Sequence, residues 1–356
     1  MRESYFFCIH SFAGLVSGLF IFLMSFSGAT LVFHDELDVF QIPDIITDQR
    51  KLATVDSCYH SIQKYYPNAQ ISNCGLPENY SKPFSFFIYD SSYKNGTAVM
   101  EVFLHPQSAL ILKTRGGNKD IQNNFMSWLS KFHSSFHLGK AGEWLLGFFS
   151  LIFSLSIISG FILFRKNILD IFLFRKTAYK SNNLHQLVGV YALLFNLMIA
   201  ITGFWMQRYV FKNEFYHTDY YTRVLKTSPP LSFSFDAAYS AIKKAYPDFT
   251  SGVIYFAQGN KGMTAVYGSR SSNSFIHSKK MADVIFLDST GSISKTRFVN
   301  EIDAADRYDI INAQLHIGKY GGLPLKIIYS LFGLTGGLLS ITGFLLWIKG
   351  KRLIKI

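Results

Sequence analysis

The chain has 356 residues, of which 49% are hydrophobic, 17% aromatic and only 16% charged. An ordinary soluble domain has about 25% charged residues, so this composition excludes that class and indicates a membrane protein. The formal net charge is +12. No compact basic domain carries that charge, which excludes a nucleic-acid-binding module.

Four stretches of the chain contain no Asp, Glu, Lys, Arg or His: residues 11–33, 144–164, 186–207 and 327–348. Each is long enough to cross a hydrocarbon core of about 30 Å as a helix. We therefore predict an α-helical bundle of four transmembrane helices. The first stretch is too long for a cleaved signal peptide, and no small-x-small cleavage site follows it cleanly.

The stretches between these helices differ greatly in length, which defines the predicted domains. In chain order these are transmembrane helix 1 (1–33), a first external module (34–132), transmembrane helix 2 (133–165), a cytoplasmic loop (166–183), transmembrane helix 3 (184–207), a second external module (208–315), transmembrane helix 4 (316–349) and a cytoplasmic tail (350–356).

The distribution of positive charge predicts which parts of the chain lie on the cytoplasmic side of the membrane. Residues 34–132 hold 9 basic and 10 acidic residues, and residues 208–315 hold 13 basic and 10 acidic residues. Nearly all of the excess therefore lies in the termini, the short loop and the helix flanks. Short basic segments stay in the cytoplasm, so both termini are expected inside and both large modules outside.

Both external modules are expected to be small α+β units. Each opens with an amphipathic helix, at 55–66 or 235–246, that ends at a Tyr-Pro pair because proline cannot continue a helix. Strand-like runs follow at 83–89, 98–104, 252–256 and 283–287. A short interfacial helix is expected at 167–174. A disulfide between Cys58 and Cys74 is possible in an oxidising compartment.

The two halves of the chain repeat one another in the order helix, external module, helix. Landmarks recur at an offset near 180: Tyr66-Pro67 with Tyr246-Pro247, Lys113-Thr114-Arg115 with Lys295-Thr296-Arg297, and Ser159-Gly160 with Thr342-Gly343. Because both halves start and end inside, a pseudo-twofold axis along the membrane normal is expected. Equivalent residues near that axis would face one another at the same depth.

Histidines at the helix edges are the candidate metal ligands. His10 precedes Gly28 by the same interval by which His185 precedes Gly203. Paired membrane histidines provide the two axial imidazoles of a haem, and ionisable residues in membrane segments are functional candidates. The competing interpretation is that these histidines only anchor helix ends at the interface.

A second pair is expected at the external side. Symmetry favours His137 with His316, because His137-Leu-Gly-Lys-Ala-Gly resembles His316-Ile-Gly-Lys-Tyr-Gly. His133 is the alternative ligand, since it lies one turn before His137, although its counterpart by offset is then Asn312. In that case His137 could serve substrate binding or proton delivery. A solvated histidine cluster is the remaining interpretation.

The other polar positions receive simpler interpretations. The pairs Ser27-Gly28, Ser159-Gly160, Thr202-Gly203 and Thr342-Gly343 are expected to pack helices together, with a haem-edge contact as the alternative. Lys140 and Lys319 could pair with haem propionates or lie at the membrane surface. No residue is assigned a catalytic role, and no nucleotide-binding fingerprint is present. Surface or packing roles are expected for His34, His60, His105, His217 and His277.

The ordered set of helix-edge motifs resembles the PepSY-associated transmembrane family over nearly the whole chain. The motifs are His10-x3-Gly14, His133-x3-His137-Leu-Gly, His185-Gln-x2-Gly189 and His316-Ile-Gly-Lys-Tyr-Gly. The external segments resemble the PepSY module, except that His105 stands where the pattern favours an acidic residue such as Asp288. The resemblance implies a bacterial inner-membrane ferric-siderophore reductase that carries two b-type haems.

Three functions therefore remain open from the sequence. The first is haem-dependent electron transfer across the membrane that reduces a periplasmic Fe(III)-siderophore and releases Fe(II) for uptake. The second is a PepSY-type peptide-binding or regulatory module without redox catalysis. The third is quinol-linked electron transfer to another external acceptor. The electron donor, either a cytoplasmic protein or a quinol, is not encoded in this chain.

Overall fold

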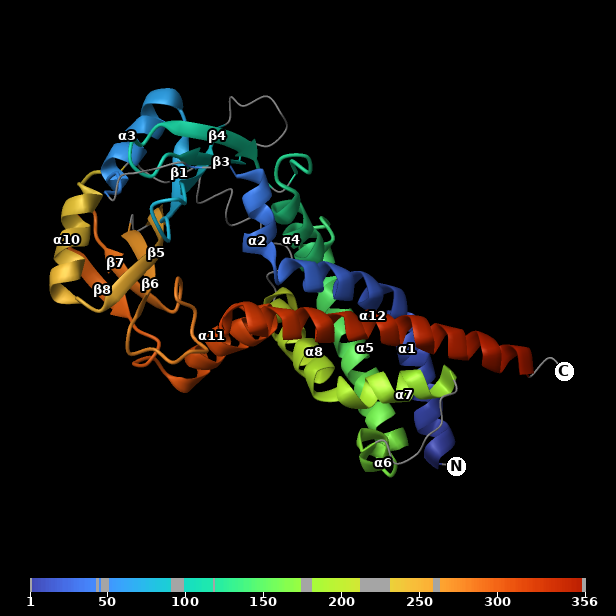
Figure 1. The fold of residues 1–356 in the computed structure, drawn as a ribbon. Coiled ribbons are helices and arrows are strands. Elements are labelled where there is room, and N and C mark those ends of the chain that lie inside the picture. Colours follow the sequence, from blue (N-terminus) through green and yellow to red (C-terminus); the bar gives the residue numbers. More distant parts are fainter. Residues whose placement is uncertain are drawn as a thin grey trace. The chain divides into compact units, whose positions relative to one another are not determined.

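The computed structural model describes residues 2–42, 45, 51–90, 99–117, 119–173, 181–211, 231–258 and 263–353. The chain divides into two compact units (Figure 1). The helical unit comprises Met1–His34, Leu129–Tyr216 and Asn312–Ile356, and the sheet unit comprises Asp35–Trp128 and His217–Ile311. Each unit therefore combines segments from both halves of the sequence.

The helical unit is built from long apolar helices that identify a multi-pass membrane protein. Three of them are long and apolar enough to span a bilayer: α1 (Arg2–Leu31), α5 (Lys140–Phe164) and α12 (Gly322–Leu353). Helix α1 packs against both α5 and α12. Many large apolar side chains on these helices stay exposed, as lipid-facing surfaces require.

The third expected span is not one straight helix. It consists of α7 (Ser181–Tyr191) and α8 (Leu193–Gln207), which are bent by 64° at Ala192 and together pass as one broken span. The unit therefore has three spans, or four if the bent pair counts as one. The short helix expected at 167–174 is present as α6 (Ile168–Phe172).

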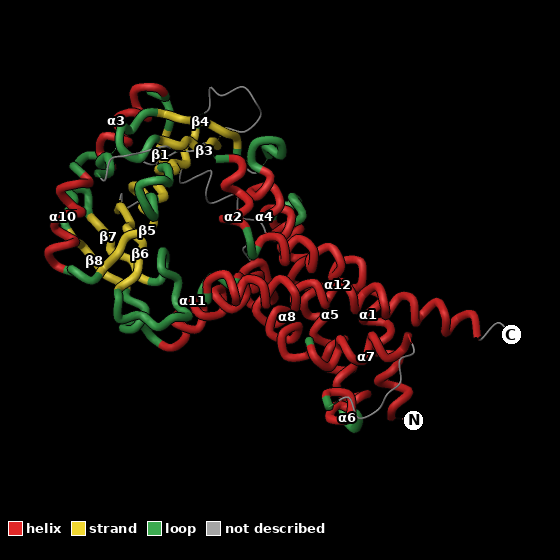
Figure 2. Tube along the Cα trace, in the orientation of Figure 1, coloured by secondary structure: helices red, strands yellow, loops and turns green. Residues whose placement is uncertain are grey.

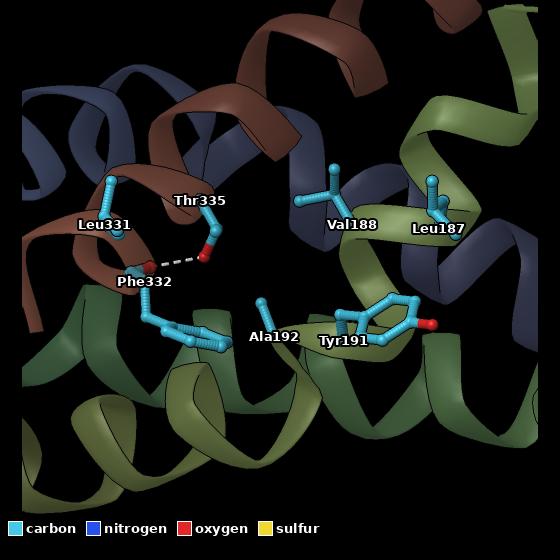
Figure 3. Close-up of a pocket in the computed structure, with 7 residues that line it drawn as sticks. All are labelled: Leu187, Val188, Tyr191, Ala192, Leu331, Phe332 and Thr335. Atoms are coloured by element: carbon cyan, nitrogen blue, oxygen red, sulfur yellow. Dashed lines mark hydrogen bonds between the residues drawn. The ribbon is translucent and has the colours of Figure 1, made fainter. Parts of the chain in front are cut away.

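An apolar cavity of about 340 Å³ opens beside the bend (Figure 3). It is lined by residues of α7, the bend and α12, namely Leu187, Val188, Tyr191, Ala192, Leu331, Phe332 and Thr335. No charged side chain lines it. A cavity of this chemistry suits an alkyl chain and does not suit a polar metal chelate.

The strands of the sheet unit are drawn yellow in Figure 2. They form one antiparallel sheet with the order β4-β3-β2-β1-β5-β6-β7-β8. Its first half holds β1 (Gln70–Gly75), β2 (Phe84–Tyr89), β3 (Val99–Leu104) and β4 (Ile111–Gly116). The second half holds β5 (Phe249–Gln258), β6 (Met263–Arg270), β7 (Asp283–Leu287) and β8 (Ile293–Arg297).

The two external segments are joined rather than separate. Strands β1 and β5 pair at the middle of the sheet, with Cys74 opposite Ile254. This pairing places the strands of the two segments on either side of the centre of one eight-stranded sheet. The observed unit is α+β, as the sequence predicts.

The core of the sheet unit lies between the sheet and two helices, α3 (Val55–Tyr65) and α10 (Phe235–Ala245). Alternate residues of β2, namely Phe84, Phe86 and Ile88, are buried, as a strand with one covered face requires. Cys58 and Cys74 both lie in this core and are not disulfide-bonded. Burial raises the pKa of the Cys58 thiol to about 12.

Two aspartates cap the helices α3 and α10 reciprocally. The carboxylate of Asp236 accepts from the backbone N–H groups of Val55 and Asp56, each at 3.1 Å. The carboxylate of Asp56 accepts from Phe235 N at 2.8 Å and from the Ser234 hydroxyl. Partial burial acts to raise the pKa of Asp56, but these hydrogen bonds outweigh it and hold that pKa below its usual value.

We expect Asp56→Ala to destabilise the N-terminus of α10 by about 1–2 kcal/mol, because the helix loses its capping acceptors. Hydrogen exchange of the α10 amides in the whole protein measures this change. Asp56→Asn keeps one acceptor oxygen and should cost less. An equal loss in both variants would show that charge matters more than the cap.

His105 occupies a turn of the first half at the position that Asp288 holds in the second half. Both side chains accept hydrogen bonds from the backbone of their turn. The His105 Nδ1 atom accepts from the backbone N–H groups of Gln107 and Ser108, both at 3.3 Å. In the second half, the Asp288 carboxylate accepts from Thr290 N at 2.8 Å and from Ser292 N at 3.1 Å. An imidazole nitrogen therefore replaces a carboxylate as the turn acceptor.

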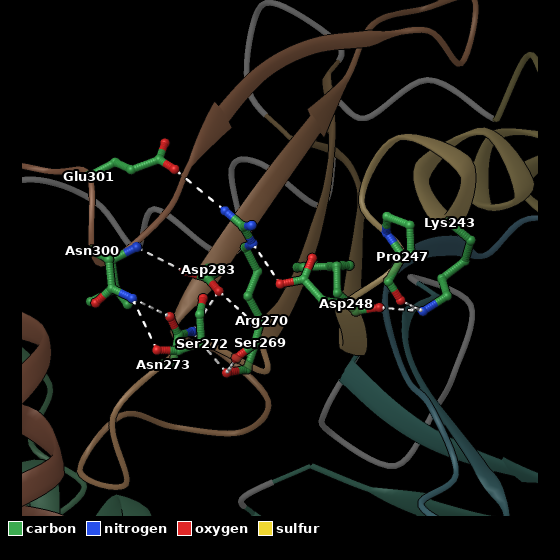
Figure 4. Close-up of polar contacts among 12 residues, drawn as sticks. Lys243, Pro247, Asp248, Ser269, Arg270, Ser272, Asn273, Asp283, Asn300 and Glu301 are labelled. Atoms are coloured by element: carbon green, nitrogen blue, oxygen red, sulfur yellow. Dashed lines mark hydrogen bonds and ion pairs between the residues drawn. The ribbon is translucent and has the colours of Figure 1, made fainter.

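A cluster of polar side chains connects the ends of β6, β7 and β8 in the second half of the sheet (Figure 4). Asp283 is fully buried and accepts from Arg270 N and Val299 N, both at 2.8 Å, and from Asn273 Nδ2 at 2.6 Å. The Arg270 guanidinium binds Asp248 at 3.0 Å and Glu301 at 3.4 Å. Because each buried oxygen of Asp283 has donors, the cluster fastens the loop after β6 to the end of β8.

Candidate functional site

The helical unit brings His10 and His185 together. His10 lies on α1 and His185 on α7, and their ring centroids are 6.1 Å apart with an interplanar angle of 73°. The two residues come from equivalent positions in the two halves of the sequence. The pairing expected from their spacing is therefore present in the structure.

A second pair is formed by His133 and His316. His133 lies on α4 (Phe125–Ser135) and His316 on α11 (Ala304–Ile317), and their ring centroids are 6.3 Å apart. His133 contacts α1 at Ser27 and Gly28, about five helical turns beyond His10. With a rise of 1.5 Å per residue, the two pairs are separated by about 25 Å along α1.

The expected pairing of His137 with His316 is not what the structure shows. Helix α4 ends at Ser135, and both Phe136 and His137 adopt positive φ angles, 49° and 59°. This turn carries His137 away to an exposed position, where its ring lies 6.5 Å from that of Phe132. Asn312, the supposed counterpart of His133, instead donates to the Thr202 carbonyl at 3.3 Å.

Each of the four paired histidines lies against a glycine on a neighbouring helix. A Cβ atom built on the glycine would meet the imidazole Cε1 at 2.9 Å for Gly160 and His10, and at 3.0 Å for Gly28 and His133. The corresponding distances are 3.2 Å for Gly203 and His316, and 3.3 Å for Gly343 and His185. The small-residue pairs therefore pack helices together, as expected, with an imidazole as the partner.

The Nδ1 atom of each histidine is held by an oxygen from the same neighbouring helix. His10 Nδ1 lies 2.8 Å from the Ser156 carbonyl, and His133 Nδ1 lies 2.8 Å from the Ser27 hydroxyl. His185 Nδ1 lies 2.8 Å from the Thr342 hydroxyl, and His316 Nδ1 lies 2.9 Å from the Thr202 hydroxyl.

These contacts favour the tautomer that carries its proton on Nδ1. A carbonyl can only accept, so His10 must donate through Nδ1–H. Ser27, Thr202 and Thr342 each donate their single hydroxyl proton to a carbonyl of their own helix at 2.8 Å, so toward the histidine they accept. The lone pair of every ring then resides on Nε2.

His133 and His316 lie outside the candidate spans and are held neutral. Burial, followed by the neighbouring His316, lowers the pKa of His133 to about 3. Burial lowers the pKa of His316 to about 4, against a hydrogen bond to the Ile199 backbone that acts to raise it. Both imidazoles therefore keep a free nitrogen lone pair at neutral pH.

The remaining histidines lie apart from both pairs. His34 begins the short helix α2 (His34–Asp38), His60 is exposed on α3, and His277 is buried near the Ser274 hydroxyl. His217 lies outside the described residues. Lys140 forms an ion pair with Glu143 at 3.3 Å on α5.

The family of the chain follows from a comparison of its full sequence. The family model described as the PepSY-associated TM region matches residues 7–350, which include all four paired histidines and nearly all of both units. The chain belongs to this family. The PepSY-associated resemblance carried by the histidine-bearing helix ends is therefore confirmed at family level. No curated protein matches the chain.

Proposed function

We propose that this PepSY-associated protein is an inner-membrane ferric-siderophore reductase with two bis-histidine haem b sites. His10 and His185 hold the cytoplasmic haem, and His133 and His316 hold the periplasmic haem. The basic termini and the basic 165–183 segment favour a topology with both chain ends in the cytoplasm and the sheet unit in the periplasm.

The distance between the rings of each pair is the observation that carries this proposal. A metal bound by two opposing imidazoles, with metal–nitrogen bonds of about 2 Å, separates their ring centroids by about 6 Å. The observed separations are 6.1 Å and 6.3 Å. The two imidazoles of each pair would hold a b-type haem, which would supply one-electron chemistry at that site.

When bound, the two haems would supply one-electron transfer from a cytoplasmic or quinol donor to an Fe(III) chelate on the periplasmic side. The substrate changes from Fe(III) to Fe(II), which hard oxygen donors hold less tightly, so iron leaves the siderophore. The chain itself orients the imidazoles, keeps Nε2 deprotonated and seats each ring over a glycine. The lipid membrane separates the two sides.

The glycines that lie against the paired histidines allow a direct test of the proposed haem sites. We expect Gly160→Ala to weaken haem binding by about 10- to 100-fold, as loss of ligand support does elsewhere, because the new Cβ would press on His10. Gly18→Ala on α1 is the matched control, since a Cβ there meets nothing within 4 Å. Haem content per purified chain measures both. Equal haem content in the two variants would contradict the proposed role of Gly160 in leaving room for the His10 imidazole.

The reductase activity is tested by mixing the chemically reduced protein with an Fe(III)-siderophore under anaerobic conditions. We expect the b-type absorption to return to its oxidised form while a ferrous chelator captures Fe(II). Haem that is reoxidised by other acceptors but never by Fe(III)-siderophores would favour quinol-linked transfer to a different acceptor. A protein that binds no haem would favour the peptide-binding or regulatory module.

A further inference from the structure

The four histidines do not share the same kind of Nδ1 acceptor. For three of them, the acceptor is the hydroxyl of the residue just before the seating glycine: Ser27, Thr202 or Thr342. Ser159 occupies the fourth such position, before Gly160. Its hydroxyl donates instead to the Leu155 and Ser156 carbonyls, at 2.8 Å and 3.0 Å, and does not contact His10.

We propose that Ser27, Thr202 and Thr342 are positioning residues that tune the haem sites, whereas Ser159 is not. Each hydroxyl holds its histidine with Nδ1 protonated, so that the nitrogen lone pair lies on Nε2. An acceptor at Nδ1–H makes Nε2 a stronger donor, which stabilises the ferric form and lowers the midpoint potential. This inference rests on the proposed haem sites.

Ser27 should have the largest influence of the three. His316 and His185 also have backbone hydrogen-bond partners, at Ile199 and Leu339 respectively. Among the described residues, His133 has the Ser27 hydroxyl as its one hydrogen-bond partner. Removing that hydroxyl leaves the Nδ1–H of His133 without an acceptor.

Three serines offer a matched set of identical substitutions. Ser27→Ala removes the contact with His133. Ser159→Ala removes a hydroxyl that also precedes a seating glycine. This hydroxyl contacts no histidine, but it shares the Ser156 carbonyl with His10 Nδ1. Ser17→Ala removes a buried hydroxyl on α1 that donates to the Ala13 carbonyl at 2.7 Å and has no histidine partner.

Redox titration of the haem-loaded protein, followed by its b-type absorption, separates these variants. We expect Ser27→Ala to make one of the two haems about fivefold easier to reduce, which is the effect of one net hydrogen bond. For a one-electron couple this is a positive shift of about 40 mV. Ser17→Ala should leave both potentials unchanged, and Ser27→Thr should restore the original value. Ser159→Ala should shift neither potential as far as Ser27→Ala does, because the Ser156 carbonyl that accepts from His10 is retained.

Two results would overturn the inference. One is an unchanged potential in Ser27→Ala. The other is a shift of the same size in Ser159→Ala, which would indicate general loosening of the helices. Neither result depends on whether the reduced haems react with an Fe(III)-siderophore, so the proposed reductase activity can fail separately.

Histidine-selective ¹⁵N NMR of the haem-free protein tests the positioning role without the cofactor. In the wild-type protein we expect His133 to be the Nδ1–H tautomer, and in Ser27→Ala a mixture of tautomers. The same single tautomer in both proteins would contradict the role of Ser27. Absence of haem from the expressed protein would contradict the proposed function. The ¹⁵N NMR measurement would still test whether Ser27 sets the tautomer of His133.

Discussion

Replacing His133 by alanine is expected to remove one of the two haems, whereas replacing His137 by alanine leaves both in place. The reason is positional, because His133 faces His316 at 6.3 Å between ring centroids, and a turn with positive φ angles carries His137 to an exposed position. His316→Ala should remove the same haem as His133→Ala. Pyridine haemochrome analysis per mole of purified chain measures the loss.

The two variants control for one another because the residues lie one helical turn apart in sequence and both substitutions remove an imidazole. Loss of haem in His137→Ala with full retention in His133→Ala would reverse the assignment. A combined His133→Ala and His10→Ala variant should contain no haem. Retention of the His10–His185 haem in His133→Ala would show that the helical unit is still folded.

Replacing Arg115 by methionine is expected to destabilise the sheet unit by about 3–5 kcal/mol, which is typical when one partner of a buried ion pair is removed. The Arg115 guanidinium binds Asp38 through two nitrogens, at 2.7 Å and 2.8 Å, and Glu101 at 2.8 Å. The three side chains are 3%, 9% and 8% exposed, respectively. Methionine would leave two buried carboxylates uncompensated.

The sequence repeat supplies the control for Arg115. Arg297 holds the equivalent place in the second half, but its ion pair with Asp306, at 3.0 Å, has side chains that are 38% and 51% exposed. Exposed pairs contribute about 0–1 kcal/mol, so Arg297→Met should have little effect. Hydrogen exchange of β3 and β4 in the whole protein measures the first variant, and exchange of β7 and β8 measures the second. Similar losses in the two halves would contradict this account.

The membrane helices and the first histidine pair were predictable because their signals are local or repeat at fixed spacing. Charge-free stretches identify three of the helices directly. The sequence offset that relates His10 to His185 is the same as the offset that relates Gly28 to Gly203. The pair at His10 was therefore supported by two independent landmarks of the repeat.

The structure brings His316 together with His133 and not with His137, which the local sequence similarity around His137 favours. The sequence offset between Ser159 and Thr342 is the same as the offset between His133 and His316. Pairing His137 with His316 requires an offset that is shorter by one helical turn. The offset between Ser159 and Thr342 identifies His133 as the counterpart of His316. Extra residues in the turn after α4 shift the His-Leu-Gly segment of the first half out of register with the similar segment of the second half.

Two features of the fold have no local signal. The pairing of β1 with β5 joins strands from opposite halves of the chain, and β1 contains polar residues, among them Asn73, that do not mark a central strand. The bend at Ala192 lies within a charge-free stretch that contains no proline. Both features depend on contacts between distant parts of the chain.

The haem content of the wild-type protein tests the central claim most directly. The protein would be expressed with an adequate haem supply, purified in detergent, and examined by reduced-minus-oxidised spectroscopy with haem quantified per chain. We predict a b-type signal corresponding to two haems per chain, reduced to one by substitution of His10 or His133. Absence of a b-type signal under these conditions would contradict the assignment of both histidine pairs.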